Sequence, residues 1–178
     1  MTTTNTKEQA FEWLIEKALV GTTWEERGDG ADVDSQQPAE GQFYWGLPKD
    51  MDPKTAIDRR RLWSFLHATQ QEELDKYVGT QMEKEVEKQI DMDLRTFGLI
   101  HVLKNDICVQ NIKLRLFFPR PSAADAEATK EKYAANQFSV TRQQTYSLIK
   151  PGNEIDMVIF VNGLPLFTLE LKNPWTFQ

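Results

Sequence analysis

The sequence is poor in residues that several classes of protein depend on. It has one cysteine, Cys108, so no internal disulfide can form. Its two histidines, His67 and His101, have no Cys or His partner at the spacing of a zinc site. The phosphate-binding pattern G-x-x-x-x-G-K-[ST] is absent, which excludes an ATP site of that type. Cys108 is therefore expected to be a small core residue.

Long apolar runs are also missing. No stretch of about 18 apolar residues exists, so no helix is expected to span a membrane. The polar N-terminus, MTTTNTKEQAFEW, lacks the apolar segment of a secretion signal. These absences predict a cytoplasmic protein that makes no membrane contact.

What is present suffices for one domain. The chain has 178 residues, of which 40% are hydrophobic, enough for a core. The net charge of −6 lies in residues 21–53, which hold eight acidic and two basic residues, while the rest of the chain is neutral. Five glycines and three prolines predict that this segment is a long surface loop. Overall charge therefore neither supports DNA binding nor excludes it.

Hydrophobic periodicity predicts helices first and a cluster of strands afterwards. Helices are expected at 7–20, 54–78, 81–97 and 122–137, and strands at 111–118 and 138–148, followed by a hairpin. The first helix should bury Phe11, Leu14, Ile15, Ala18 and Leu19; the second, Ile57, Leu62, Phe65 and Leu66. This order predicts an α/β (α+β) fold in which a mixed central sheet is flanked by helices.

Other prominent side chains have ordinary explanations. Trp13, Trp24, Trp45 and Trp63 are expected to pack in the core or pin the acidic loop, and Trp175 to be exposed. The run Arg59–Arg61 is expected on a solvated helix face, with phosphate contact as the alternative.

The C-terminal hairpin, EIDMVIFVNGLPLFTLELKNP, is nearly all apolar but contains three charged residues, Asp156, Glu170 and Lys172. Glu170 and Lys172 are two apart and share one face of their strand. A two-residue turn at Asn162-Gly163 would place Asp156 opposite Leu169, whereas a three-residue connection would place it opposite Glu170. An odd-length or bulged turn is therefore expected if the charges converge.

Convergence would predict a metal site. Two close carboxylates repel unless a cation or a proton is shared between them. Mg²⁺ prefers oxygen ligands, here Asp156, Glu170 and the carbonyl of Leu171, with Mn²⁺ as a substitute. Lys172 could orient or deprotonate a metal-bound water, or neutralise a phosphate. The alternative is that Asp156 ends a strand and Glu170 and Lys172 form a solvated edge pair.

The stretch EIDMVIFVNGLPLFTLELKNPWTFQ resembles the nuclease motif of the restriction (R) subunit of type I restriction-modification enzymes, a branch of the PD-(D/E)xK nucleases. AFEWLIEKAL, LWSFLHATQ, LFFPRP and YAANQFSVTRQQTYS resemble the same N-terminal region in the same order. The resemblance implies a Mg²⁺-dependent type I site-specific deoxyribonuclease. In it, Asp156 and Glu170 bind metal and Lys172 is the catalytic lysine.

The resemblance also implies partners and missing parts. The partners would be double-stranded DNA and the methylation and specificity subunits. The family continues with a helix that carries a Gln-x-x-x-Tyr motif and with ATP-dependent motor domains, so ATP would bind only there. Residues 1–178 are thus expected to be an N-terminal endonuclease domain, incomplete after Lys172 and weak or inactive alone. Ile155 replaces the common proline before Asp156, a small departure.

The resemblance also suggests further site residues outside the hairpin. The family's fold often brings a helix glutamate towards the metal, and Glu12 is better placed for this than Glu16, which is expected to face solvent; Glu8 is the rival. Arg142 and Gln143 could face the cleft or form a sheet-edge pair. Two alternatives to a nuclease remain. One is a non-catalytic scaffold of the same complex, and the other is a stand-alone interaction protein.

Overall fold

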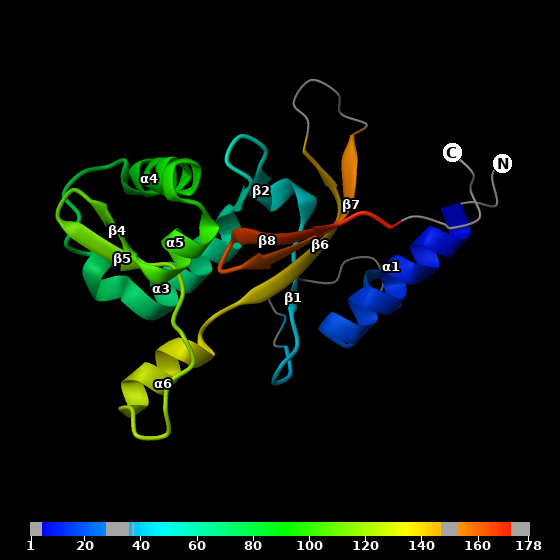
Figure 1. Ribbon diagram of the computed structural model, residues 1–178, viewed down its shortest axis with the longest axis horizontal. Coiled ribbons are helices and arrows are strands. Elements are labelled where there is room, and N and C mark those ends of the chain that lie inside the picture. Colours follow the sequence, from blue (N-terminus) through cyan, green and yellow to red (C-terminus); the bar gives the residue numbers. More distant parts are fainter. Residues whose placement is uncertain (1–4, 28–35, 37, 147–152, 172–178) are drawn as a thin grey trace.

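The computed structural model describes residues 5–27, 36, 38–146 and 153–171, and its centre is a four-stranded mixed sheet (Figure 1). The strand order is β1-β6-β7-β8, in which β1 is parallel to β6 and the other pairs are antiparallel. The strands are β1 (Tyr44–Trp45), β6 (Phe138–Thr145), β7 (Glu154–Val161) and β8 (Leu164–Leu169). The predicted α/β class with a mixed central sheet is confirmed.

Helices and two small hairpins surround this sheet. The helices are α1 (Asn5–Val20), α2 (Trp24–Arg27), the 3₁₀ turn η1 (Pro48–Asp50), α3 (Arg59–Leu74), α4 (Met82–Phe97), α5 (Leu99–Lys104) and α6 (Glu127–Ala134). The hairpins join β2 (Met51–Asp52) to β3 (Ile57–Asp58), and β4 (Asp106–Val109) to β5 (Ile112–Arg115). Within the described part of the chain, no helix is long and apolar enough to cross a membrane.

Helix boundaries follow local capping. The second helix begins at Arg59 rather than Lys54, because the Asp58 carboxylate accepts the N–H of Arg61 and so caps α3. The helix expected at 122–137 is shorter, while α4 agrees with its prediction to one residue. The four apolar residues predicted for the second helix region are all buried, although Ile57 lies in β3.

The described residues form three apolar cores, of which two pack the helices and the third is a small cluster of Met51, Val158 and Phe160. The larger of the two packs α3, α4 and α5 against β4–β5, and includes Phe65, Leu66, Ile90 and Leu114. The smaller of the two lies between α1 and the sheet, and includes Val20, Trp45, Val140 and Met157. In Figure 1, α1 and the α3–α5 group accordingly lie on opposite sides of the central sheet.

The turn of the β7–β8 hairpin joins the sheet to the larger core. Asn162 and Gly163 both have positive φ, 49° and 82°, as a two-residue turn of this kind requires. The carbonyl of Gly163 accepts the N–H of Asp58 at 2.9 Å, directly before α3. The buried side chain of Asn162 also bonds the backbone of Gln137 and Leu116. The hairpin is thus fixed at its turn.

The face of α1 that packs on the sheet differs from the prediction. Phe11 and Leu14 are 53% and 65% exposed, and Ala18 is exposed as well. Glu12 and Glu16 are only 4% and 2% exposed, so the expectation that Glu16 faces solvent is wrong. The physical reason is a basic partner on β6, described below, that makes burial of two carboxylates tolerable.

The acidic segment is more structured than a surface loop. It contains α2, β1 and η1, and Trp45 is buried in the smaller core. Trp24 packs edge-on against Trp45, and Trp63 is buried, as expected; Trp13 is partly exposed on α1, and its side chain hydrogen-bonds Glu25 of the acidic segment. Trp175 lies outside the described residues.

Two expectations about single residues are wrong. Cys108 is exposed, because alternation along β4 turns Ile107 and Val109 inward instead. Arg61 is buried rather than solvated: its Nη2 donates to the carbonyl of Trp45 at 2.6 Å, and its guanidinium lies 4.3 Å from the Tyr44 ring centroid.

Candidate functional site

A β-bulge in the C-terminal hairpin decides how its charged residues lie. Next to the two-residue turn, Val161 pairs with Leu164 and Phe160 with Pro165. The register then shifts by one residue, so that Ile159 pairs with Phe167 and Met157 with Leu169. The extra residue on β8 is therefore Leu166. The connection has two residues, but the bulge supplies the shift that a three-residue connection would have given.

This register brings Asp156 and Glu170 to matching positions. Met157–Leu169 is the last pair of the ladder, and Asp156 and Glu170 are the next residues outward on each side. The backbone N–H of Leu171 donates to Oδ2 of Asp156 at 2.5 Å, so the segment that follows β8 stays bonded to β7 beyond the last ladder pair. Asp156 is half-buried and Glu170 is exposed.

Other predicted site residues are placed less fully. Lys172 and the side chain of Glu8 lie outside the described residues. The described residues contain no group of three or more His, Cys, Asp and Glu side chains that could hold a metal ion. Glu12 lies within electrostatic reach of Asp156, whose negative charge is one cause of a raised pKa at Glu12.

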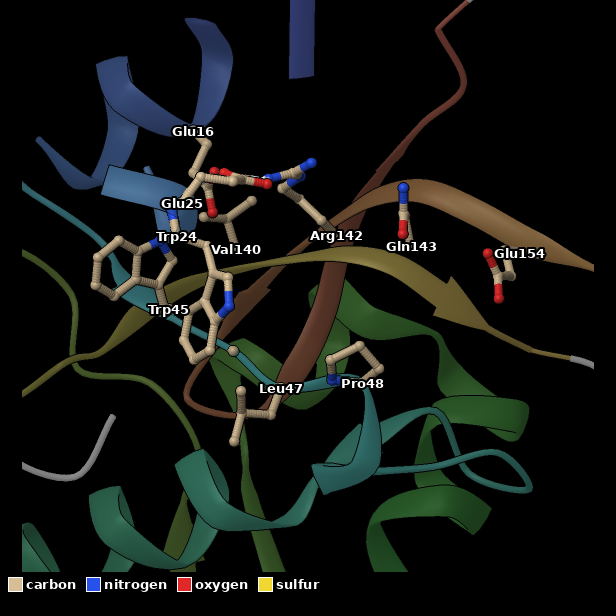
Figure 2. A pocket seen from close by; sticks show the side chains of 11 residues that line it. Glu16, Trp24, Glu25, Trp45, Leu47, Pro48, Val140, Arg142, Gln143 and Glu154 are labelled. Carbon is tan, nitrogen blue, oxygen red and sulfur yellow. Dashed lines mark hydrogen bonds and ion pairs between the residues drawn. The ribbon is translucent and has the colours of Figure 1, made fainter. Parts of the chain in front are cut away.

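Arg142 on β6 gathers three carboxylates from α1 and α2. Its Nε donates to Glu12 at 3.1 Å, and its Nη1 contacts Glu16 at 3.0 Å and Glu25 at 2.9 Å. Figure 2 shows Glu16 and Glu25 converging on the guanidinium. The pairing of β1 with β6 covers Ser139 and Val140, and the ladder pair of Arg142 is Met157 on β7. The ion pairs therefore agree with the sheet-edge pair that the sequence offered as an alternative, although the guanidinium is largely buried.

The buried carboxylates of α1 are electrostatically strained. Burial raises the pKa of Glu12 above its ordinary value; Arg142 opposes the rise, and the charges of Asp156 and Glu25 add to it. Burial likewise raises the pKa of Glu16, again opposed by Arg142. Arg142 thus favours the charged form of both carboxylates against the effect of burial, and for Glu16 the backbone N–H of Trp24 acts in the same direction.

The backbone of β6 is distorted beside Asp156. Arg142 pairs with Met157 and Gln144 with Ile155, but Gln143, which stands between them opposite Asp156, has a positive φ of 51°. This conformation is costly for a residue other than glycine. Gln143 is exposed and, as Figure 2 shows, lines a pocket of about 380 Å³ together with Arg142 and Glu154.

The donor set suits a hard divalent cation. The carboxylates of Asp156 and Glu170 and the carbonyl of Leu171 are oxygen ligands of the kind that Mg²⁺ and Mn²⁺ prefer. No sulfur or imidazole donor belongs to the set. The residues present therefore fit magnesium in their chemistry, and waters would complete its coordination sphere.

These features define a mixed α/β protein whose C-terminal hairpin carries Asp156 and Glu170 at matching backbone positions. The family model for the type I restriction enzyme R protein N terminus matches residues 49–178. The chain belongs to this family, as its motifs suggested. A search of curated proteins and a search of solved structures each gave no match.

Sequence reasoning missed the role of Glu16 and Glu25. A signal for Glu16 was present, since Glu12, Glu16 and the buried Val20 recur every four residues along one line of α1. Apolar residues were expected on the buried face, so Glu16 was assigned to solvent, while Glu12 was expected to approach the metal site. Their shared partner, Arg142, is more than a hundred residues away in the chain and could not be paired with them from spacing.

Proposed function

We propose that this chain is the metal-dependent endonuclease domain of a type I restriction enzyme R subunit, with a PD-(D/E)xK fold that hydrolyses DNA phosphodiester bonds. The observation that carries the proposal is the bulge at Leu166, which brings Asp156 and Glu170 to matching positions on β7 and the end of β8. Family membership supports the restriction context. Double-stranded DNA and the methylation and specificity subunits are the proposed partners.

Each candidate site residue has a chemical role in this proposal. Asp156, Glu170 and the carbonyl of Leu171 would hold Mg²⁺, which when bound acidifies a water and stabilises negative charge on the phosphate. Lys172 either orients and deprotonates the attacking water or neutralises the phosphate. The water oxygen bonds to phosphorus, one ester P–O bond breaks, and the leaving oxygen takes up a proton.

The bulge explains why such a site can be built on a tight hairpin. A two-residue turn alone would oppose Asp156 to Leu169, with Glu170 out of register. The additional residue on β8 corrects this without lengthening the turn, which stays packed on Asp58 and α3. The bulge therefore sets the register at Asp156, while the turn separately anchors the hairpin on α3.

One observation favours a second function, that of a non-catalytic scaffold in the same complex. Arg142 already engages the carboxylates of Glu12, Glu16 and Glu25. A guanidinium in that place takes over part of the charge compensation that a metal ion would provide. The two functions differ in whether a cation binds at Asp156.

Mn²⁺ titration of the 178-residue chain, followed by electron paramagnetic resonance, separates these two functions. A nuclease site should bind one Mn²⁺, and Asp156→Asn or Glu170→Gln should weaken it by about tenfold or more. Asp106→Asn is the matched control, because Asp106 is an exposed strand aspartate in the separate β4–β5 sheet. Absence of binding, or equal loss in the control, would favour the scaffold.

A further inference from the structure

The contacts of Arg142 are unusual in number and in burial. One guanidinium bonds carboxylates from two helices, and its side chain is 14% exposed, while those of Glu12 and Glu16 are 6% and 3% exposed. Ion pairs at the surface contribute little to stability, but breaking a buried one leaves an uncompensated charge and is strongly destabilising. Arg142 therefore adds buried ion pairs to the apolar contacts that hold α1 and α2 to this part of the sheet.

The place of Arg142 in the ladder connects these contacts to the candidate metal site. Arg142 pairs with Met157, the neighbour of Asp156 in β7. Met157 in turn pairs with Leu169, the neighbour of Glu170. One row of three paired residues thus runs across the sheet immediately beside the two carboxylates, and the Glu12 side chain is bonded to its first member.

We propose that Arg142 is a positioning residue: by bonding Glu12, it sets where the Glu12 carboxylate lies relative to Asp156, and it thereby sets the affinity of the Asp156 site for a metal ion. The inference rests on the proposed function and deepens it. Arg142 touches neither the metal nor the substrate in this scheme, and it acts through Glu12.

Arginine is required for this role by its geometry. A planar guanidinium presents five N–H donors in a fixed fork and can contact several carboxylates at once. Here two nitrogens reach three partners, with Nε on Glu12 and Nη1 on Glu16 and Glu25. A lysine ammonium keeps the positive charge but has one nitrogen on a flexible stem, so it cannot fix the direction of Glu12 in the same way.

The test is Mn²⁺ affinity in Arg142→Lys, measured on the full 178-residue chain. The substitution conserves charge, so a change in affinity reports geometry rather than long-range attraction. We expect binding about tenfold weaker, the usual effect of removing an outer-sphere partner. The control is Arg59→Lys: Arg59 bonds Glu87 at 2.7 Å and Glu83 at 3.5 Å between α3 and α4, and it follows Asp58, which lies at the turn of the hairpin and not at the open end with Asp156. Its Mn²⁺ affinity should stay within about twofold of the wild type.

A double substitution separates positioning from a general loss of structure. In a Glu12→Gln background, adding Arg142→Lys should weaken Mn²⁺ binding by a further factor of less than about two. The reason is that Arg142 acts through the Glu12 carboxylate, which this background has already removed. A full tenfold loss in that background would overturn the inference. If Arg142→Lys melts below the assay temperature, Arg142→Gln, which retains an N–H donor, is measured instead with the same expectation.

The outcomes also distinguish this inference from the proposed function. If the wild type binds Mn²⁺, Asp156→Asn loses it and Arg142→Lys does not, the role of Arg142 is wrong and the nuclease site stands. If the wild type binds no Mn²⁺, the proposed function fails and the inference fails with it.

Discussion

The backbone N–H of Leu171 donates to Oδ2 of Asp156, 2.5 Å away, across the open end of the β7–β8 hairpin. This contact lies beyond the last ladder pair, Met157–Leu169, and holds the backbone of Leu171 at Asp156. It exists because the bulge at Leu166 has shifted the register by one residue. The geometry of the candidate site thus follows from one extra residue in one strand.

The packing of the hairpin turn gives a first prediction. A Cβ added at Gly163 would lie 2.4 Å from the carbonyl of Asp58 and 2.6 Å from the nitrogen of Leu62. Gly163→Ala should therefore lower the free energy of unfolding by more than about 2 kcal/mol, measured by urea denaturation. Gly41→Ala is the control, since Gly41 has a similar φ of 80° and no atom within 4 Å of its added Cβ. It should cost about 1 kcal/mol, and equal losses would show that the turn is not anchored on α3.

A second prediction concerns Asp58, the cap of α3. Burial raises its pKa from 3.8 to about 6, although the N–H and charge of Arg61 oppose the rise. The folded state therefore holds this proton more tightly than the unfolded state. The resulting stabilisation is fully present below about pH 4 and is lost as the pH rises through about 6.

Asp58→Asn keeps a capping side chain and removes the titration. The unfolding free energy of the wild type relative to Asp58→Asn should fall by up to about 3 kcal/mol between pH 4 and pH 7. Urea denaturation at several pH values measures this difference. A difference that stays constant with pH would contradict the burial argument.

A third prediction is that the 178-residue chain cuts DNA poorly by itself. Residues 21–53 carry a net charge of −6, and Arg142 is surrounded by three carboxylates. Arg59 and Arg60 are paired with Glu87 and Asp50. Such a surface has little to hold a polyanion at physiological salt. Supercoiled plasmid with Mn²⁺ should be nicked no faster than by Asp156→Ala, and robust nicking that this substitution abolishes would refute the charge argument.

The parts of the fold that follow from local rules were predictable. Asn162-Gly163 between apolar runs predicted the hairpin, and the periodicity of 81–97 predicted α4. The sequence allowed two registers for the hairpin, with Asp156 opposite either Leu169 or Glu170, and it could not decide between them. The bulge that decides the register depends on how β8 twists against its neighbour and on Pro165, which has no N–H for the ladder.

The face of α1 could not be predicted because its partner is distant in sequence. Periodicity placed Phe11 and Leu14 inward, but the structure buries Glu12 and Glu16 against Arg142. A buried carboxylate is favourable only when a specific cation meets it, and that pairing depends on the tertiary fold. The same holds for Arg61, whose partner is the backbone of Trp45.

The most direct test of the central claim is DNA cleavage by a reconstituted type I restriction complex whose R protein carries this chain as its N-terminal region. Cleavage of unmodified plasmid and ATP hydrolysis are measured together for the wild type, Asp156→Ala, Glu170→Ala and Lys172→Ala, with Asp106→Ala as the control. We predict that the three hairpin substitutions abolish cleavage while ATP hydrolysis continues, and that the control retains both. Cleavage that persists in Asp156→Ala would contradict the assignment of the nuclease site to this hairpin.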